Sequence, residues 1–144
     1  MTARARPRVD PAAEGWEASP AGPYMTWLGP VWRRQGGDGF EYGIVGQEKH
    51  ANHRNSVHGG VIMAFADYAL GRTAVDLIGH DSQVTAQIDL QFVATAEIGS
   101  LLIGRGEIIR RTSSLFFVRG TIEAGGKIVA SAQGVWKTVK ANGV

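Results

Sequence analysis

His58, Gly59 and Gly60 stand directly before a long apolar segment, and Asp67 lies within that segment. Two glycines at the start of a helix let the backbone approach a ligand closely. The first N–H groups of a helix have no partners inside it and lie at the positive end of its dipole. Such a terminus can stabilise the oxyanion that forms when a carbonyl carbon is attacked. These residue types therefore indicate a site for chemistry at a carbonyl group.

Asp67 allows two interpretations. A carboxylate on an otherwise apolar helix costs several kcal/mol unless it has a partner or a task. Its task could be catalysis, as a base or a nucleophile in a pocket. It could instead form a buried ion pair with an arginine such as Arg72, or hydrogen-bond a neighbouring backbone group. The residue type leaves both interpretations open.

The spacing of Gly59 and Asp67 has a geometric consequence. Asp67 follows Gly59 by eight positions, which is about 12 Å along an α-helix. Groups that act on one carbon must come within about 3 Å of it. If both residues act on the same carbonyl, they must belong to different chains, with two antiparallel helices related by a two-fold axis. We therefore expect a homodimer at least, with two equivalent sites.

One long helix and a set of strands must position these residues. Residues 61–78 are apolar on nearly every side, which predicts a buried helix, while Asp67, Arg72 and Asp76 argue against a membrane span. Residues 84–92 alternate between apolar and polar side chains, which predicts a strand with one buried face. Further strands are predicted at residues 31–34, 40–45, 101–111, 115–123 and 128–139, with a tight turn at Gly125 and Gly126. The expected fold class is α+β, a curved antiparallel sheet wrapped around one helix, with the C-terminal half as a meander.

The composition fits one ordinary globular domain. With 144 residues, of which 44% are apolar and 19% charged, the chain can bury a core without disulfides or metals. Residues 1–22 are rich in Ala, Pro and Arg and show no apolar period, so we predict a mobile tail there and one domain over residues 23–144. The basic start of this tail is followed by no apolar stretch, which does not fit a signal peptide, so the cytoplasm is the expected location.

Several classes of site are disfavoured. The net charge is only +2, and the basic residues lack interleaved aromatics, so no nucleic-acid partner is expected. The absence of cysteine excludes thiolate nucleophiles and cysteine zinc sites. His50, His53 and His58 lie in a loop without a carboxylate at matching spacing, so no metal is expected. The glycines of the predicted strands fit sheet curvature or close packing better than a phosphate loop; they are Gly104, Gly106, Gly120 and Gly134.

The loop and the start of the predicted helix resemble the PaaI-like branch of the hotdog-fold thioesterases, in the 4-hydroxybenzoyl-CoA thioesterase-type superfamily. That pattern has an Asn, a Gly three residues later, His-Gly-Gly three residues further on, and an Asp seven residues after the second Gly. The matching residues are Asn52, His58, Gly59, Gly60 and Asp67. The family's usual Gly within the loop is Asn55 here, and Asn is the residue with a side chain that best tolerates positive φ. The resemblance extends over roughly residues 23–140 and implies the hotdog fold.

The resemblance implies a role for each matched residue. Asp67 would be the catalytic carboxylate, either as a nucleophile through an anhydride or as a general base on water. The Gly59 N–H would polarise the thioester carbonyl, and the Asn52 amide would orient water or the carbonyl oxygen. His58 would shape the loop and contact the carbonyl region. Thr85 aligns with a Ser or Thr that positions water and is expected on the polar side of its strand, where an ordinary exposed threonine is the alternative.

The implied substrate is an acyl-CoA or aryl-acyl-CoA thioester, hydrolysed to the free acid and CoA without a separate cofactor. The acyl group is expected in an apolar tunnel between subunits, with Met63, Phe65 and Tyr68 as candidates for its wall and core packing as the alternative. Gly60 is a further candidate substrate-binding residue, and Arg110, Arg111 and Arg119 are the candidates for the CoA phosphates. The expected assembly is a homotetramer built from two dimers, with no membrane partner. Two other functions remain open: an enoyl-CoA hydratase or dehydratase of the same fold, and a non-catalytic acyl-CoA-binding protein.

Overall fold

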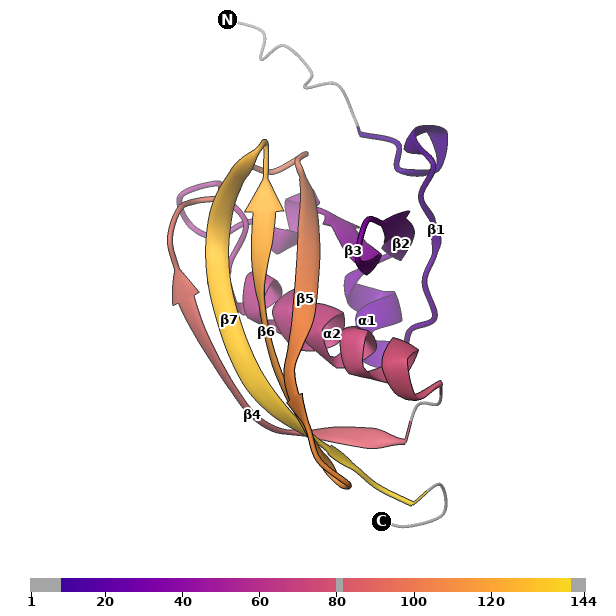
Figure 1. Cartoon of the computed structure of the whole chain (residues 1–144). Coiled ribbons are helices and arrows are strands. Elements are labelled where there is room, and N and C mark those ends of the chain that lie inside the picture. The colour runs from indigo at the N-terminus through magenta and orange to yellow at the C-terminus, as the bar shows by residue number, and fades with distance from the viewer. Residues whose placement is uncertain (1–8, 80–81, 141–144) are drawn as a thin grey trace, which may run out of the picture.

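The computed structural model of the chain describes residues 9–79 and 82–140. One long helix, α2 (Gly59–Ile78), lies against the inner face of an antiparallel sheet that curves around it (Figure 1). The strands are β1 (Glu17–Ala18), β2 (Val31–Gly36), β3 (Gly39–Val45), β4 (Gln83–Phe92), β5 (Leu101–Arg111), β6 (Leu115–Ala124) and β7 (Lys127–Thr138). The described residues also form three short helices: η1 (Ala12–Glu14), α1 (Pro23–Leu28) and η2 (Glu48–His50). The predicted fold class, a curved antiparallel sheet around one long helix, is confirmed.

Capping residues set the limits of α2. At its start, the backbone of His58 is extended and its Nδ1 accepts a hydrogen bond from the Gly60 N–H, as an N-cap side chain does. At its end, Gly79 adopts a left-handed φ of 77° and its N–H donates to Val75 O. Both glycines of the His-Gly-Gly sequence are helical, so α2 begins two residues before the predicted start.

The strand order is β1-β2-β3-β5-β6-β7-β4. Strands β5, β6 and β7 form the predicted meander, and Gly125 and Gly126 both have positive φ in the hairpin turn between β6 and β7. The meander does not include β4, which pairs with β7 at the sheet edge while β3 pairs with β5. Within the described chain, the outer side of β4 therefore has no partner strand.

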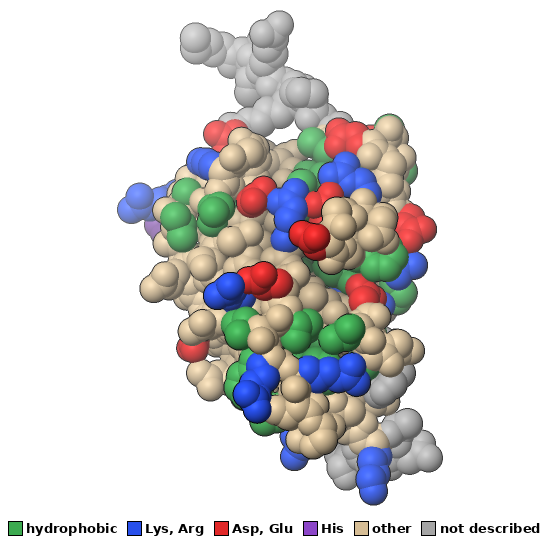
Figure 2. Space-filling view, in the orientation of Figure 1, with side chains coloured by type: hydrophobic (Ala, Val, Ile, Leu, Met, Phe, Trp, Pro, Cys, Tyr) green, Lys and Arg blue, Asp and Glu red, His purple; other side chains and the backbone are tan. Residues whose placement is uncertain are grey.

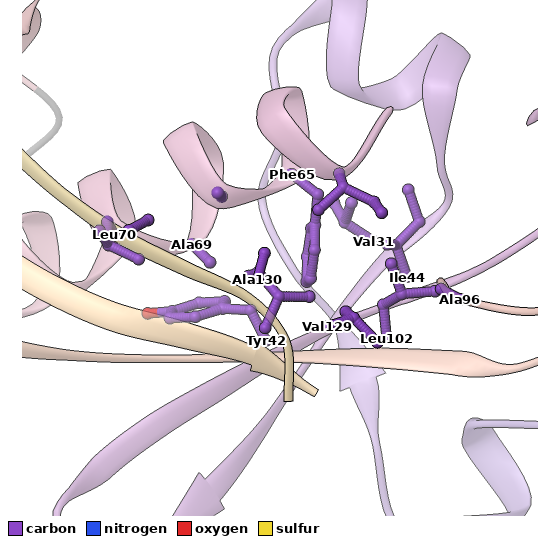
Figure 3. Close-up of a cluster of buried hydrophobic side chains, with 14 of the residues drawn as sticks. Val31, Tyr42, Ile44, Phe65, Ala69, Leu70, Ala96, Leu102, Val129 and Ala130 are labelled. Carbon is purple, nitrogen blue, oxygen red and sulfur yellow. The ribbon is translucent and has the colours of Figure 1, made fainter. Parts of the chain in front are cut away.

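The core lies between α2 and the inner face of the sheet. Phe65, Ala69 and Leu70 of α2 pack with Tyr42 and Leu102 in one cluster of buried side chains (Figure 3). Phe65, a predicted contact of the acyl group, is fully buried in this cluster. It therefore serves the core, which was the alternative interpretation of its position.

Glycines on β5 allow the helix to approach the sheet closely. A Cβ at Gly104 would lie 2.7 Å from the Ala69 Cβ, and a Cβ at Gly106 would lie 2.6 Å from the Thr73 Oγ1. Real Cβ atoms do not come so close to other atoms, so the sheet could not curve this tightly around α2 with side chains at these two positions. The predicted use of these glycines for close packing is confirmed.

The segment before α1 differs from the predicted tail. Glu17 and Ala18 form β1 and pair with β2, and the side chain of Trp16 is only 4% exposed. The guanidinium of Arg34 lies 4.4 Å above the Trp16 ring. Residues 16–18 are therefore attached to the sheet, whereas residues 1–8 of the predicted tail lie outside the described chain.

The outer face of the sheet is charged and largely self-neutralising. Arg105 donates hydrogen bonds to Glu41 and Glu123, and Arg119 is paired with Glu107. Acidic and basic side chains accordingly lie next to one another on this face (Figure 2). Among the described residues, the helices are too short or too polar to cross a membrane.

The contact between Gly104 and Ala69 gives a test of the helix–sheet packing. Gly104→Ala should lower the free energy of unfolding by about 1–3 kcal/mol, because the added methyl group overpacks the interface. Urea denaturation measures the difference. Gly37→Ala is the control, since a Cβ there meets nothing within 4 Å. Equal stability of the two variants would contradict the close approach.

Candidate active site

The start of α2 offers one backbone donor to a ligand. The Gly60 N–H is bonded to His58 Nδ1, while the N–H groups of Val61 and Ile62 donate to His58 O. In the described chain the Gly59 N–H has no hydrogen-bond acceptor. Its position at the positive end of the helix dipole suits a carbonyl oxygen or an oxyanion.

Phe92 of β4 lies directly beside Gly59. A Cβ at Gly59 would meet the Phe92 ring at 3.1 Å, so glycine is what allows the aromatic ring to pack against the start of the helix. The ring is 57% exposed despite this contact. Phe92 was not among the predicted site residues, because the alternation of β4 indicated only that it faces inward.

The loop before α2 is held by its own side chains. Asn52 Oδ1 accepts hydrogen bonds from the N–H groups of Arg54 and Ser56, and Asn52 Nδ2 donates to Ser56 Oγ. Asn55 has a φ of 59°, so it adopts the positive φ that the sequence analysis said an Asn can tolerate here. The Asn52 amide therefore braces the loop in the structure, and its predicted contact with water or substrate remains a prediction.

His50 anchors the same loop to the core. Its Nδ1 accepts a hydrogen bond from the Gln47 N–H, so the neutral ring carries its proton on Nε2 and donates it to Leu28 O at 2.8 Å. Its own carbonyl oxygen accepts the His58 N–H. Desolvation by burial lowers the pKa of His50 from its usual value of 6.5, and the nearby charge of Lys49 acts in the same direction. His50 is thus a neutral structural residue that positions His58.

Asp67 is held by Thr85. The Thr85 hydroxyl donates a hydrogen bond of 2.7 Å to Asp67 Oδ1, and Asp67 Oδ2 has no partner within the described residues. Arg72, the alternative partner considered for Asp67, forms its ion pair with Asp76 at 3.3 Å. The carboxylate is therefore oriented through one oxygen while the other remains available to a ligand.

A β-bulge explains how Thr85 reaches the helix. The pairing of β4 with β7 shifts register between Thr85 and Gln87, with Ala86 as the extra residue. Thr85 is consequently opposite the buried Trp136, on the inner face of the sheet, and Val84 is half exposed. Strict alternation of side chains along β4 predicted that Thr85 lies on the polar face of the sheet, and that prediction is wrong. Bulges re-aim side chains in this way beside functional sites.

A cavity of about 550 Å³ adjoins the carboxylate. Asp67, Tyr68 and Thr85 line it, as do residues that the sequence did not single out: residues 20–22, Gly71, Arg72, Val75, Gln83 and Trp136. Of the predicted acyl contacts, Tyr68 lies in this cavity, whereas Gly60 and Met63 do not line it. A larger cavity of about 1270 Å³, over the β2–β3 turn and β5, contains neither Gly59 nor Asp67. We therefore take the smaller cavity as part of the candidate site.

The predicted phosphate contacts lie at the same end of the sheet as Thr85. Arg111 pairs with Phe116 on β6, and its guanidinium lies 5.4 Å from the centre of that ring. Phe116 is in register with Trp136 on β7, and Trp136 with Thr85 on β4. Three strand spacings separate Arg111 from Thr85, about 14 Å. Arg110 and Arg111 thus do not line the cavity beside Asp67.

A single chain holds the candidate groups in two separate places. Gly59 and Asp67 belong to one uninterrupted helix, so eight residues keep them about 12 Å apart. Both lie beside β4, Gly59 at Phe92 and Asp67 at Thr85. Because of this separation, one substrate carbon cannot contact both groups of the same chain. No cluster of metal-binding side chains occurs among residues 9–79 and 82–140.

Comparison with known proteins places these residues in context. The family model described as "Thioesterase superfamily" matches residues 54–131, which include His58, Gly59, Asp67 and Thr85. A curated protein of Pseudomonas aeruginosa, named provisionally as an esterase, is 30% identical over 118 residues, which are 79% of this chain and 87% of that protein.

Solved structures share the fold. A protein of Ralstonia eutropha JMP134, described provisionally as a thioesterase related to phenylacetic acid degradation, has 25% identity and a TM-score of 0.74, covering 83% of this chain and 92% of its own. A single-residue mutant of the phenylacetic acid degradation protein PaaI from Thermus thermophilus has 18% identity and a TM-score of 0.72, covering 82% and 100%. A Bacillus halodurans protein solved with CoA has 22% identity and a TM-score of 0.71, covering 83% and 78%. The predicted resemblance to PaaI-like hotdog proteins is confirmed.

The buried state of His50 predicts a pH-dependent stability. Because the folded-state pKa is lowered, the unfolded chain binds a proton at this residue more readily, and stability should fall as pH drops below about 6.5. His50→Gln should lose less stability than the wild type between about pH 7.5 and pH 5.5. Urea denaturation at the two pH values measures this, with exposed His53→Gln as the control. An equal pH dependence in His50→Gln and the wild type would refute the assignment.

Proposed function

Because this chain belongs to the thioesterase superfamily, we propose that it hydrolyses acyl-CoA thioesters at a site shared by two subunits. Membership of the family supports thioester hydrolysis as the general reaction. CoA as the carrier of the acyl group is in keeping with the Bacillus halodurans neighbour, which was solved with CoA. The observation that carries the shared site is that the free Gly59 amide and the Asp67–Thr85 pair both lie beside β4, an edge strand whose outer side has no partner strand in the described chain.

The unpaired edge of β4 supplies the symmetry that the site needs. Gly59 lies near one end of this strand, against Phe92, and Asp67 lies near the other, bonded to Thr85. When two β4 strands pair antiparallel about a two-fold axis at the middle of the strand, the Gly59 end of one strand lies beside the Asp67 end of the other. The Gly59 amide of each subunit then faces the Asp67 carboxylate of the other. The same two-fold rotation also makes the two α2 helices antiparallel, as the sequence led us to expect.

The surface near this edge favours association. Val84, Phe92 and Val93 are exposed by 50%, 57% and 60%, and Met63 of α2 is 37% exposed. The sequence of β4 contains neither Lys nor Pro, the residues that often protect a free edge from pairing. An apolar, hydrogen-bonding edge of this kind is expected to bind another chain. We infer a homodimer as the minimal active unit, with a homotetramer of two dimers as the larger assembly.

The chemistry follows from the two groups. The thioester carbonyl oxygen accepts the Gly59 N–H, which stabilises the negative charge that develops there. In the general-base route, Asp67 Oδ2 takes a proton from water, the water oxygen attacks the carbonyl carbon, and the C–S bond breaks. The thiolate of CoA then receives the proton, which leaves free CoA and the carboxylic acid. In the nucleophilic route, Oδ2 attacks first and water hydrolyses the resulting anhydride.

Thr85 and the loop residues support either route. Thr85 donates to Asp67 Oδ1 and so directs Oδ2 toward the substrate. His58 fixes the start of the helix through Nδ1, and Asn52 fixes the loop that leads to it. Their direct contacts with the carbonyl region, and those of Arg110 and Arg111 with the CoA phosphates, are part of the proposal.

The free amide can be removed without adding a polar group. Proline is tolerated at the first helical position, and the extended backbone of His58 suits the residue before a proline. Gly59→Pro should lower kcat/KM for acyl-CoA hydrolysis by about 10²–10³-fold, as loss of one oxyanion donor does. Thiol release from a panel of acyl-CoAs measures the effect.

Gly59→Ala is the matched control for this variant. It places the same Cβ against the Phe92 ring but keeps the N–H, so it should retain far more activity than Gly59→Pro. Similar losses in both variants would show that crowding at Phe92, and not the amide, limits the reaction.

Mixing two inactive variants tests the shared site. Asp67→Asn and Gly59→Pro should each be inactive alone, because every site lacks one group. Heterodimers contain one site with both groups intact, so random mixing of equal amounts should restore about a quarter of wild-type activity. Differently tagged chains, refolded together and purified through both tags, allow the thiol release of the heterodimer to be measured.

Asp38→Asn, in the exposed β2–β3 turn, is the matched control and should keep wild-type activity. Heterodimers that form but release no thiol, or a chain that stays monomeric while active, would overturn the shared site. Hydration of enoyl-CoA without thiol release would favour the hydratase class. Binding of acyl-CoAs without any turnover would favour a non-catalytic binding protein.

A further inference from the structure

Phe92 covers one side of the free amide at the start of α2. Apart from the α2 backbone and His58, the three atoms nearest to a Cβ at Gly59 all belong to the Phe92 ring, with Cζ closest at 3.1 Å. Because N and Cβ are bonded to the same Cα, the ring tip lies within about 6 Å of the Gly59 nitrogen. At the next residue, the His58 ring binds the Gly60 N–H. Two rings therefore meet the helix start, and the phenyl ring lies beside the amide that stays free.

Backbone hydrogen bonds hold the Phe92 ring at this place. Phe92 is the last residue of β4 and pairs with Ala130 of β7. The segment that follows β4 is joined to the loop that leads into α2, because the Val57 N–H donates to Ala96 O at 2.9 Å. The end of the strand and the start of the helix are thus tied together, and the contact between Phe92 and Gly59 does not depend on side-chain packing alone.

Most of the ring surface is uncovered in the described chain. Phe92 is 57% exposed, although its tip touches Gly59. When two β4 strands pair about their middle, as the proposed function requires, the last residue of one strand lies beside the first residue of the other, Gln83 of the partner subunit. Asp67 of the partner subunit lies at that same end. The exposed side of the ring therefore borders the space that the proposed function assigns to the thioester carbonyl.

A phenyl ring in this place changes how the amide meets water. A free N–H in contact with water is hydrogen-bonded to it, and this bond must be exchanged when a carbonyl oxygen binds. A donor also stabilises a developing negative charge more strongly where water is excluded, because the local dielectric constant is lower. The phenyl ring carries no hydrogen-bonding group, so it displaces water beside Gly59 without competing for the amide.

We propose that Phe92 shields the Gly59 amide from water and so strengthens the bond of this amide to the oxyanion. The inference rests on the proposed hydrolysis, in which the Gly59 N–H binds the thioester carbonyl. Phe92 acts through the amide and takes no part in bond making or breaking, so it is a positioning residue. An apolar side chain of similar length at position 92 preserves the shield, whereas a short side chain admits water.

Shortening the side chain should slow the chemical step. Phe92→Ala should lower kcat for acyl-CoA hydrolysis by about tenfold, less than loss of the amide itself, and change KM by less than about twofold. Phe92→Met keeps a long apolar side chain and should retain at least about a third of the wild-type kcat. Thiol release measures both variants.

Val93→Ala is the matched control for this pair. Val93 is 60% exposed at the same end of β4, but the atoms nearest to a Cβ at Gly59 belong to Phe92 and not to Val93. This variant removes apolar surface from the proposed dimer edge and should keep the wild-type kcat. All variants are compared at a concentration at which gel filtration shows the oligomeric state of the wild type. A Phe92→Ala variant with the wild-type kcat would overturn the shielding.

A double variant shows whether Phe92 acts through the amide. Gly59→Pro has no N–H to shield, so in that background Phe92→Ala should lower the residual kcat by less than about twofold. The same tenfold loss in both backgrounds would overturn the proposal, because Phe92 would then act independently of the amide.

Amide hydrogen exchange tests the shield without any substrate. In the described chain the Gly59 N–H has no acceptor, so its exchange rate depends on the access of water. NMR should show at least about threefold faster exchange of this amide in Phe92→Ala and an unchanged rate in Val93→Ala. An unchanged rate in Phe92→Ala would overturn the shielding. Faster exchange in Phe92→Ala, together with a wild type that releases no thiol from any acyl-CoA, would refute the proposed hydrolysis and leave the shielding of the amide in place.

Discussion

The rigidity of α2 is the constraint on which the candidate site depends. The helix carries both the free Gly59 amide and the Asp67 carboxylate, and its backbone hydrogen bonds keep them about 12 Å apart. Packing against Gly104 and Gly106 of β5 leaves α2 no room to bend toward the sheet. The two groups therefore cannot act on one substrate carbon within a single chain. Within residues 9–79 and 82–140 no strand pairs with the outer edge of β4, which runs beside both groups, and the proposed function uses this edge to bring in a second copy.

The local features of this arrangement could be predicted from the sequence. The apolar segment after His58 indicated the buried helix because nearly every side of it is packed, and the two glycines before it indicated an accessible helix start. Asn55 was predicted to tolerate positive φ, and its φ is 59°. These predictions needed only neighbouring residues. The strand order of the hotdog fold was harder to predict from the residues, because β4 lies beside β7 through a pairing between segments that are far apart in the sequence.

Non-local contacts account for what the sequence did not reveal. Alternation in β4 placed Thr85 on the polar face, but the bulge at Ala86, which arises only when β4 pairs with β7, turns it toward Asp67. The two residues of β1 carry too little periodicity to be recognised as a strand. The burial of Trp16 depends on Arg34 and on the outer face of the sheet. A cavity built from the N-terminal segment, α2, β4 and β7 has no signature in any one of them.

The helix start and the cavity beside Asp67 are different parts of the candidate site, because Gly59 does not line that cavity. Under the proposed function, the Gly59 amide and the Asp67 carboxylate that act on one carbonyl come from two different subunits. The cavity beside Asp67, by contrast, is lined by Tyr68, Gly71 and Trp136 of the same chain. Tyr68 follows Asp67 on the helix, and its hydroxyl donates a hydrogen bond to Pro20 O in the N-terminal segment that lines this cavity.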